Sequence, residues 1–167
     1  DFTILGGELD LDWFRERIAN SFEVKFRGRL GPAEGDDKRI RILNRGIEWT
    51  DQGIRYEPDR RHTEIIIRNL GLEKDSKSVV TPMCRMEVEG AEEPLRPDMA
   101  TMYRATVARG IYLSQDRSDI QYAVKELSRA MSTPTKLDWE RLKRLGRYLV
   151  GRMRYVTVYP YQENSQF

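Results

Sequence analysis

The spacing of apolar side chains changes along the chain, and each change predicts a different element. Residues 2–5 read Phe-Thr-Ile-Leu, which favours a short strand, and the Gly-Gly pair behind them predicts a turn. Between about residues 8 and 22 the apolar positions recur every three or four residues, with charged residues between them. This period predicts an amphipathic helix whose apolar face carries Leu11, Phe14, Ile18 and Phe22.

The clearest β pattern is ILNRGIEWTDQGIRYE, at residues 42–57. Two runs of alternating apolar and polar residues flank Asp51, Gln52 and Gly53. We predict a hairpin with a three-residue connection, because Gly53 can take the left-handed position that such loops use.

A second amphipathic helix follows the hairpin. Pro58 precedes it, Asp59 is a suitable N-cap, and Gly71 ends it. The positions that it is expected to bury are Ile65, Ile66 and Leu70. Residues 73–98 are acidic, contain Pro and show no period, which predicts a linker or an extended traverse and the best candidate for a domain boundary.

Three helices and a closing strand are predicted beyond that stretch. The first helix covers about residues 98–113. The second begins at Ser118, where Ser118 and Gln121 fit a capping box, and the third has Pro134 near its first position. Residues 155–161 alternate Val and Tyr, as a strand does. The inward faces of the second and third helices carry Ile120, Val124, Leu127, Met131, Leu142, Leu145 and Leu149.

The composition is that of a highly charged chain with enough apolar residues for a core. Of its 167 residues, 39% are hydrophobic and 34% are charged. That length fits one domain or two small ones, and the apolar runs fall well short of the roughly 18 residues that span a bilayer. Cys84 is the only cysteine and His62 the only histidine. These counts exclude an internal disulfide and a zinc site of the Cys/His type.

The charge is unevenly distributed, although the net charge is only +2. Between residues 136 and 154 the acids are Asp138 and Glu140, against seven basic residues. These are Lys136, Arg141, Lys143, Arg144, Arg147, Arg152 and Arg154. A local basic excess of this kind is compatible with contacts to phosphate, and also with an ordinary solvated helix face.

Several sequence motifs between residues 103 and 151 match one family. The run YRATVARGIYLSQDRSDIQYAVKELSRAMSTPTKLDWERLKRLGRYLVG resembles the C-terminal part of copia-type retrotransposon reverse transcriptases. The family usually has Pro at the position of Ser118 and His near Trp139. The matching motifs are Tyr103-Arg104, Tyr112-Leu113, Asp116 to Val124, Ser128-Arg129, Pro134-Thr135 and Arg147 to Gly151.

The resemblance implies an α+β fold made of a partial palm followed by a mainly helical thumb and connection. Residues 1–72 would be the C-terminal part of the palm, with a strand, a helix and a primer-grip-like hairpin. Residues 73–98 would be a linker and residues 99–154 the thumb and connection helices. Residues 155–167 would be a strand leading toward a ribonuclease H domain that this sequence does not reach.

The resemblance also places the first residue. The start DFTILGG corresponds to the stretch after the polymerase motif Tyr-x-Asp-Asp, so Asp1 would be the second aspartate of that pair. Polymerases hold two divalent metal ions about 3.5–4 Å apart with several carboxylates. Asp1 would be a catalytic Mg²⁺ ligand in a longer parent protein, and by itself it forms an incomplete metal site. We therefore expect RNA-directed DNA polymerase activity in the parent, and neither activity nor a cofactor in the isolated chain.

Two groups of residues are expected to contact nucleic acid. In the hairpin they are Asn44, Arg45 and Gly46, because Gly46 would let the backbone approach a phosphate that Arg45 pairs. In the last helix they are Lys136, Lys143, Arg144 and Arg147, opposite its leucine stripe. The competing interpretations are an exposed hairpin and a solvated charged face.

The leading hypothesis is a reverse transcriptase fragment that positions template–primer. Its partners would be an RNA–DNA or DNA duplex and the rest of the polyprotein, in the cytoplasm or the nucleus, with no membrane. Two alternatives remain: a domesticated nucleic-acid-binding module, and a structural or interaction module whose acidic linker and helices pack against other proteins. Residues 2–5 are also expected to leave an exposed sheet edge that invites association with protein partners. For the same reason we expect faster hydrogen exchange in residues 1–30 than in the helices of residues 98–150.

Overall fold

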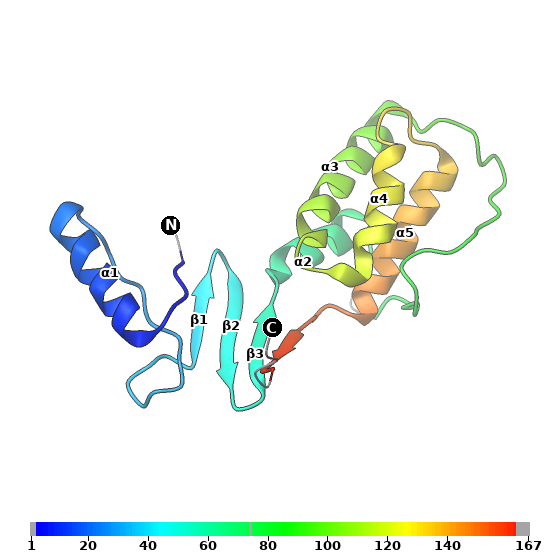
Figure 1. Ribbon diagram of the computed structural model, residues 1–167. Helices are drawn as coiled ribbons and strands as arrows, with labels where there is room; N and C mark the ends of the chain where they lie inside the picture. The colour runs from blue at the N-terminus through cyan, green and yellow to red at the C-terminus, as the bar shows by residue number, and fades with distance from the viewer. Residues whose placement is uncertain (1–2, 74, 163–167) are drawn as a thin grey trace.

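The computed structural model describes residues 3–73 and 75–162. Its elements form a four-stranded antiparallel sheet and a group of helices toward the C-terminal part, so the fold is α+β as predicted (Figure 1). In chain order they are α1 (Glu8–Ser21), β1 (Arg39–Ile42), β2 (Arg45–Thr50), β3 (Gly53–Glu57), α2 (Arg60–Asn69), α3 (Pro97–Ser114), the 3₁₀ turn η1 (Ser118–Ile120), α4 (Gln121–Arg129), α5 (Lys136–Gly151) and β4 (Thr157–Pro160).

The sheet joins the two halves of the chain. Its strand order is β1-β2-β3-β4, and each neighbouring pair is antiparallel. The first turn consists of Leu43 and Asn44, with φ of 48° and 64°, which matches the two-residue turns whose twist suits a hairpin. Because β4 comes from the end of the chain and pairs with β3, the predicted closing strand is confirmed and anchors the C-terminal segment to the sheet.

The predicted three-residue loop between β2 and β3 is wrong. Gly53 pairs with Thr50 inside the sheet, so the connection is only Asp51 and Gln52. Gly53 does have a positive φ, 146°, but the reason lies in β4. A Cβ at this position would lie 2.1 Å from the backbone oxygen of Tyr159, so only glycine allows the close approach of the two strands.

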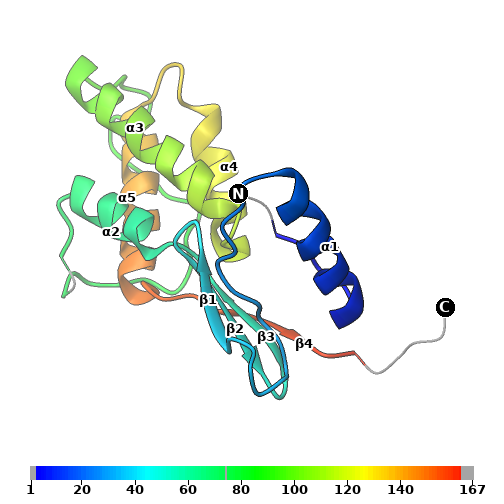
Figure 2. The same ribbon diagram turned by 90° about the vertical axis from the view of Figure 1, so that its left-hand side faces the viewer.

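The hydrophobic core lies among α2, α3, α4 and α5, which stand together in Figures 1 and 2. Tyr103 is fully buried on α3 and its hydroxyl donates a 2.7 Å hydrogen bond to the backbone oxygen of Leu127. The leucine stripe of α5 is buried as predicted, at Leu142, Leu145 and Leu149. This core holds the four helices as one packed unit.

The helix after the hairpin forms as the sequence predicts, with one difference. The carboxylate of Asp59 accepts a 3.0 Å hydrogen bond from the backbone nitrogen of Arg61 and caps α2. Gly71 takes a φ of 65° directly behind the helix. Ile66 and Leu70 are buried as expected, whereas Ile67 is buried in place of Ile65, because the core contacts a slightly rotated face of α2.

Two further local predictions are wrong. Residues 3–5 lie in irregular backbone rather than in a strand, because a strand needs a hydrogen-bonded neighbour and none of the described strands pairs with them. At Ser118 the chain forms the turn η1, and the Gln121 side chain donates to the backbone oxygen of Ser114, so the predicted capping box is absent there. The capping box is found at Thr135 and Asp138, which begin α5.

The first helix forms where the periodicity predicts it, but it contributes little to the core. None of the residues of α1, all of which the structure describes, is buried. Leu11, Phe14 and Ile18 are half-buried and Phe22 is exposed. In Figure 1 α1 lies on the far side of the sheet from the other helices. Its apolar face is therefore only partly covered.

Between α2 and α3, residues 75–96 form neither a helix nor a strand and run along the helical unit with several turns. Val79, Met83 and Leu95 pack against the core. Near the end of this segment, the backbone nitrogen of Leu95 donates a 2.9 Å hydrogen bond to the backbone oxygen of Pro134. The backbone nitrogen of Lys136 donates one of 2.9 Å to the backbone oxygen of Glu93. These contacts fix the start of α5. None of the described helices has the length and apolar character needed to cross a membrane.

Candidate nucleic-acid interface

The carboxylate of Asp116, just after the C-terminal end of α3, connects the sheet to the helical unit. Asp116 accepts a 2.7 Å hydrogen bond from Nε of Arg45 on β2 and a 2.7 Å hydrogen bond from the hydroxyl of Tyr56 on β3. The pairing of Ile47 with Tyr56 puts Arg45 and Tyr56 on the same face of the sheet. We call Arg45, Tyr56 and Asp116 the latch. It fixes the β1–β2 turn next to the C-terminal end of α3.

The latch is partly shielded from water, which strengthens it. The side chains of Arg45 and Asp116 are 19% and 13% exposed. The guanidinium carbon of Arg45 also lies 5.6 Å from the ring centre of Tyr112. The hydrogen bond that Arg45 donates to Asp116 raises the pKa of Arg45, and burial followed by the bond to Asp116 raises the pKa of Tyr56. Arg45 is thus charged and Tyr56 a neutral donor at physiological pH.

A second ionic group lies directly beside the latch and is more deeply buried. Arg117, 1% exposed, donates from Nε and Nη2 to the two oxygens of Asp119, at 2.9 and 2.6 Å. Its Nη1 donates to the backbone oxygen of Arg152 at 3.0 Å. Tyr148 on α5 donates to the same Asp119 carboxylate at 2.9 Å. This bidentate pair connects η1 to the end of α5, so its role is structural.

The two ionic groups explain one motif of the sequence. In Asp-Arg-x-Asp, at residues 116–119, the first acid binds the sheet while the arginine and second acid bind the end of α5. From the sequence alone this motif indicates only a family resemblance, and neither Asp116 nor Tyr56 is a predicted site residue. Residues 45 and 116 are 71 positions apart, so no local pattern connects them. The Asp-Arg-x-Asp motif is the one feature of the sequence that could have pointed to Asp116.

The hairpin residues expected to contact nucleic acid lie at the β1–β2 turn. Asn44 is exposed with a φ of 64°, and Arg45 and Gly46 are half-buried at the start of β2. A Cβ at Gly46 would make only an ordinary contact, 3.7 Å from Cβ of Glu57. The Nε of Arg45 is occupied by Asp116. A phosphate would have to approach the remaining nitrogens of this guanidinium.

The four basic residues of α5 differ in their surroundings. Lys136 forms an ion pair with Glu93, and Lys143 forms one with Glu140 at 3.0 Å. Arg144 donates from Nη2 to Oγ1 of Thr81 at 2.8 Å. Arg147 is exposed, and among the described residues no ion pair reaches it. Because exposed ion pairs contribute little, about 0–1 kcal/mol, the two lysines can exchange their partners for phosphates.

The structure does not bring the hairpin and helix groups into direct contact. Within the described ranges, no hydrogen bond or ion pair joins residues 44–46 to the basic residues of α5. They are linked through the latch and the packed helices, and through Arg154, which follows α5 and pairs with Glu57 on β3. Asp1, the expected Mg²⁺ ligand, lies outside the described residues. In the part of the chain that is described, no three His, Cys, Asp or Glu side chains gather to hold a metal ion.

The relatives of the chain include two retrotransposon Pol polyproteins and an uncharacterized plant protein. The chain is 34% identical over 100 residues to the retrovirus-related Pol polyprotein from transposon RE2 of Arabidopsis thaliana, and 38% identical over 76 residues to that from transposon RE1. These alignments cover 60% and 46% of the chain, but only 7% and 5% of the polyproteins. An uncharacterized mitochondrial protein of the same plant is 33% identical over 91 residues, covering 54% of the chain and 37% of that protein.

No model of a known protein family and no solved structure matches the chain. The resemblance to retrotransposon Pol polyproteins that the motifs indicate is nevertheless confirmed by the homologues. The chain spans a small part of the length of the polyproteins that it matches.

Proposed function

We propose that this chain is a segment of a retrotransposon reverse transcriptase that positions the template–primer duplex and does not itself polymerise DNA. The homology to Pol polyproteins supports the assignment to a polymerase-bearing protein. The observation that carries the positioning role is the latch, because it holds the β1–β2 turn at a fixed orientation to the helical unit whose α5 is basic.

The proposed contacts go to the phosphate backbone. Asn44 and the free nitrogens of Arg45 face one stretch of backbone, and Lys136, Lys143, Arg144 and Arg147 provide charge for another. Contacts of this kind are independent of base sequence and release counterions, so they weaken as salt rises. A rigid spacing between the two groups would define where the duplex lies.

Polymerisation is assigned to the rest of the polyprotein. Divalent metal ions supply charge stabilisation for the attacking and leaving oxygens in that reaction. Since the described residues offer no group of ligands for a metal, Asp1 is the one residue proposed as a Mg²⁺ ligand, together with carboxylates of the parent protein. We derive no metal-dependent step from this chain.

Fluorescence anisotropy with a labelled 20-base-pair RNA–DNA hybrid tests the binding role. We expect K143Q/R147Q to weaken binding and to make the slope of log K against log salt shallower, by about 0.9 for each lost phosphate contact. The matched control is K125Q/R85Q, which removes two exposed cations elsewhere. Equal losses in both variants would indicate non-specific attraction and contradict the proposal. Undetectable binding of the hybrid at low salt would favour a protein-binding module instead.

A primer-extension assay with Mg²⁺ tests the second half of the proposal. We expect no template-dependent product from this chain. Template-dependent extension by the purified chain would show that it carries a complete polymerase site.

A further inference from the structure

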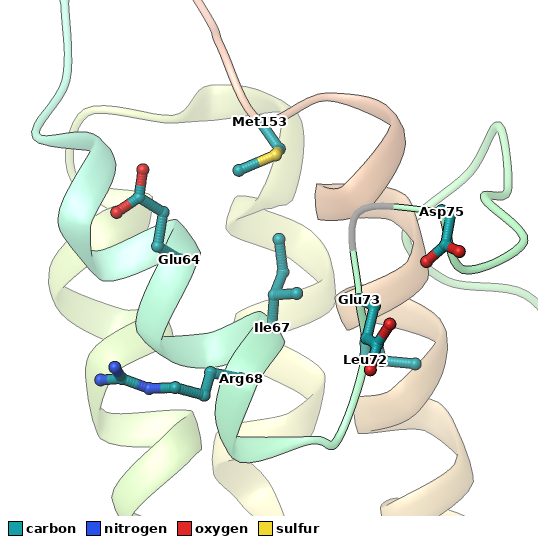
Figure 3. A pocket seen from close by; sticks show the side chains of 7 residues that line it. All are labelled: Glu64, Ile67, Arg68, Leu72, Glu73, Asp75 and Met153. Atoms are coloured by element: carbon teal, nitrogen blue, oxygen red, sulfur yellow. The ribbon is translucent and has the colours of Figure 1, made fainter.

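The helical unit has a hollow that none of the four basic residues of α5 lines. It has a volume of about 530 Å³, is open to solvent, and lies between α2, the chain that follows it, and Met153. Figure 3 shows its seven lining residues, which are Glu64, Ile67, Arg68, Leu72, Glu73, Asp75 and Met153. Its size is within the range of sites that hold a few side chains or a small ligand.

The floor of the hollow is apolar and is set firmly on the core. Ile67 lies at its centre, with Met153 above it and Leu72 beside it (Figure 3). Ile67 is only 6% exposed, whereas Leu72 and Met153 are half-exposed. Leu72 packs against α5 at Gly146, where a Cβ would come within 2.7 Å of its Cδ1. The floor therefore presents apolar surface to solvent, and its packing against the core prevents these side chains from closing the hollow.

The rim of the hollow is acidic on two sides. Glu64 extends from α2, and Glu73 and Asp75 lie on the chain opposite, with the apolar floor between them (Figure 3). Among the described residues, no ion pair or side-chain hydrogen bond reaches these three carboxylates. Arg68 is the one cation among the lining residues, and Lys74 lies outside the described residues. Three carboxylates around an apolar floor repel phosphate and attract cations.

We propose that this hollow binds a basic peptide segment of a partner protein, in which a Leu or Met side chain is flanked by Lys or Arg. The apolar side chain would cover Ile67 and Met153, and the cations would pair with Glu64 on one side and with Glu73 and Asp75 on the other. Charge complementarity selects this occupant over nucleic acid, and the apolar floor selects it over a free cation. The site is separate from the proposed duplex contacts on α5.

Binding is measured by titrating the full chain with a synthetic hexapeptide, acetyl-Arg-Lys-Leu-Leu-Lys-Arg-amide. Methyl spectra of protein labelled with ¹³C-methionine report the position, because Met153 is one of six methionines and M153L assigns its signal. We expect the Met153 methyl to shift and those of Met99 and Met102 to stay unchanged. A peptide with Ser in place of both Leu residues should bind more weakly. The leucine peptide should also bind more weakly when the salt concentration is raised.

The variant E64Q/E73Q/D75N removes the acidic rim without touching the core, and we expect at least about fivefold weaker binding of the leucine peptide. The matched control is E87Q/E89Q/E92Q, which neutralises three exposed acids on residues 73–98 outside the hollow. Equal weakening in both variants, or shifts confined to the other methionines, would overturn the proposal. So would a Met153 signal that moves with protein concentration alone, since a second copy of the chain would then be the occupant.

Discussion

The latch makes a quantitative prediction about how the sheet is held to the helices. In Asp116→Asn the amide keeps the shape of the side chain but removes the charge that binds Arg45 and Tyr56, both at 2.7 Å. A hydrogen bond to a charged group contributes about 1.5–3 kcal/mol. Because both side chains of the ion pair are partly exposed, we take the lower end for each bond. The expected cost is about 2–4 kcal/mol for docking the sheet.

Hydrogen exchange with peptide-level mass spectrometry is the suitable assay, because it separates the sheet from the helices. A loss of 1.4 kcal/mol corresponds to about tenfold faster exchange in the region that opens. We expect peptides covering β1, β2 and β3 to exchange at least about tenfold faster in Asp116→Asn. Peptides from α3 and α5 should keep their protection, since their core does not involve the latch.

Asp51→Asn is the matched control, because Asp51 is an exposed carboxylate in the β2–β3 loop, and Tyr56→Phe should give a smaller effect in the same peptides. Two results would refute the reasoning. One is unchanged exchange of the sheet in Asp116→Asn. The other is equal acceleration of the sheet and the helices, which would mean that Asp116 supports the core rather than the connection.

Three further predictions concern stability. The hydrogen bonds from the side chain and then the backbone of Arg61 lower the pKa of Asp59. The contribution of Asp59 to the free energy of unfolding is therefore present above the ordinary carboxyl pKa and is lost as pH falls through the lowered value. Asp59→Asn should reduce the loss of stability at acidic pH, measured by urea titrations. Gly146→Ala places a Cβ 2.5 Å from Cδ1 of Leu70 and should cost about 1–2 kcal/mol in urea unfolding, whereas Gly35→Ala, with open space around it, should be neutral. Residues 3–30 should exchange faster than α3 and α5 because α1 buries none of its residues, and equal protection would contradict this.

The helical half of the fold follows from its sequence because each helix carries its own signals. The stripe of Leu142, Leu145 and Leu149 has the helical period, and each of these residues is buried against neighbouring helices. The cap at Asp59 is a local interaction between residues two positions apart, which a sequence pattern can identify. Periodicity therefore identifies these helices, whereas capping is a weaker guide, since the box predicted at Ser118 is absent and one forms at Thr135.

The features that sequence reasoning missed depend on distant partners. Gly53 is required by Tyr159 of β4, and nothing near residue 53 indicates that strand. The apolar and β-branched residues 3–5 satisfy a strand pattern but lack a described neighbour to pair with. Asp116 acquires its role only when Arg45 is brought to it across the fold. Long-range pairing, rather than local propensity, determines each of these cases.

The position of a bound duplex tests the central claim most directly. A photocrosslinking amino acid, p-benzoylphenylalanine, is introduced in place of Asn44, of Arg147 or of Glu64, and each protein is irradiated with the RNA–DNA hybrid at low salt. We predict crosslinks from positions 44 and 147, which lie on the proposed contact surfaces, and none from position 64 in the acidic hollow. Crosslinking from position 64 as strong as from position 147, or none from either 44 or 147, would contradict the account.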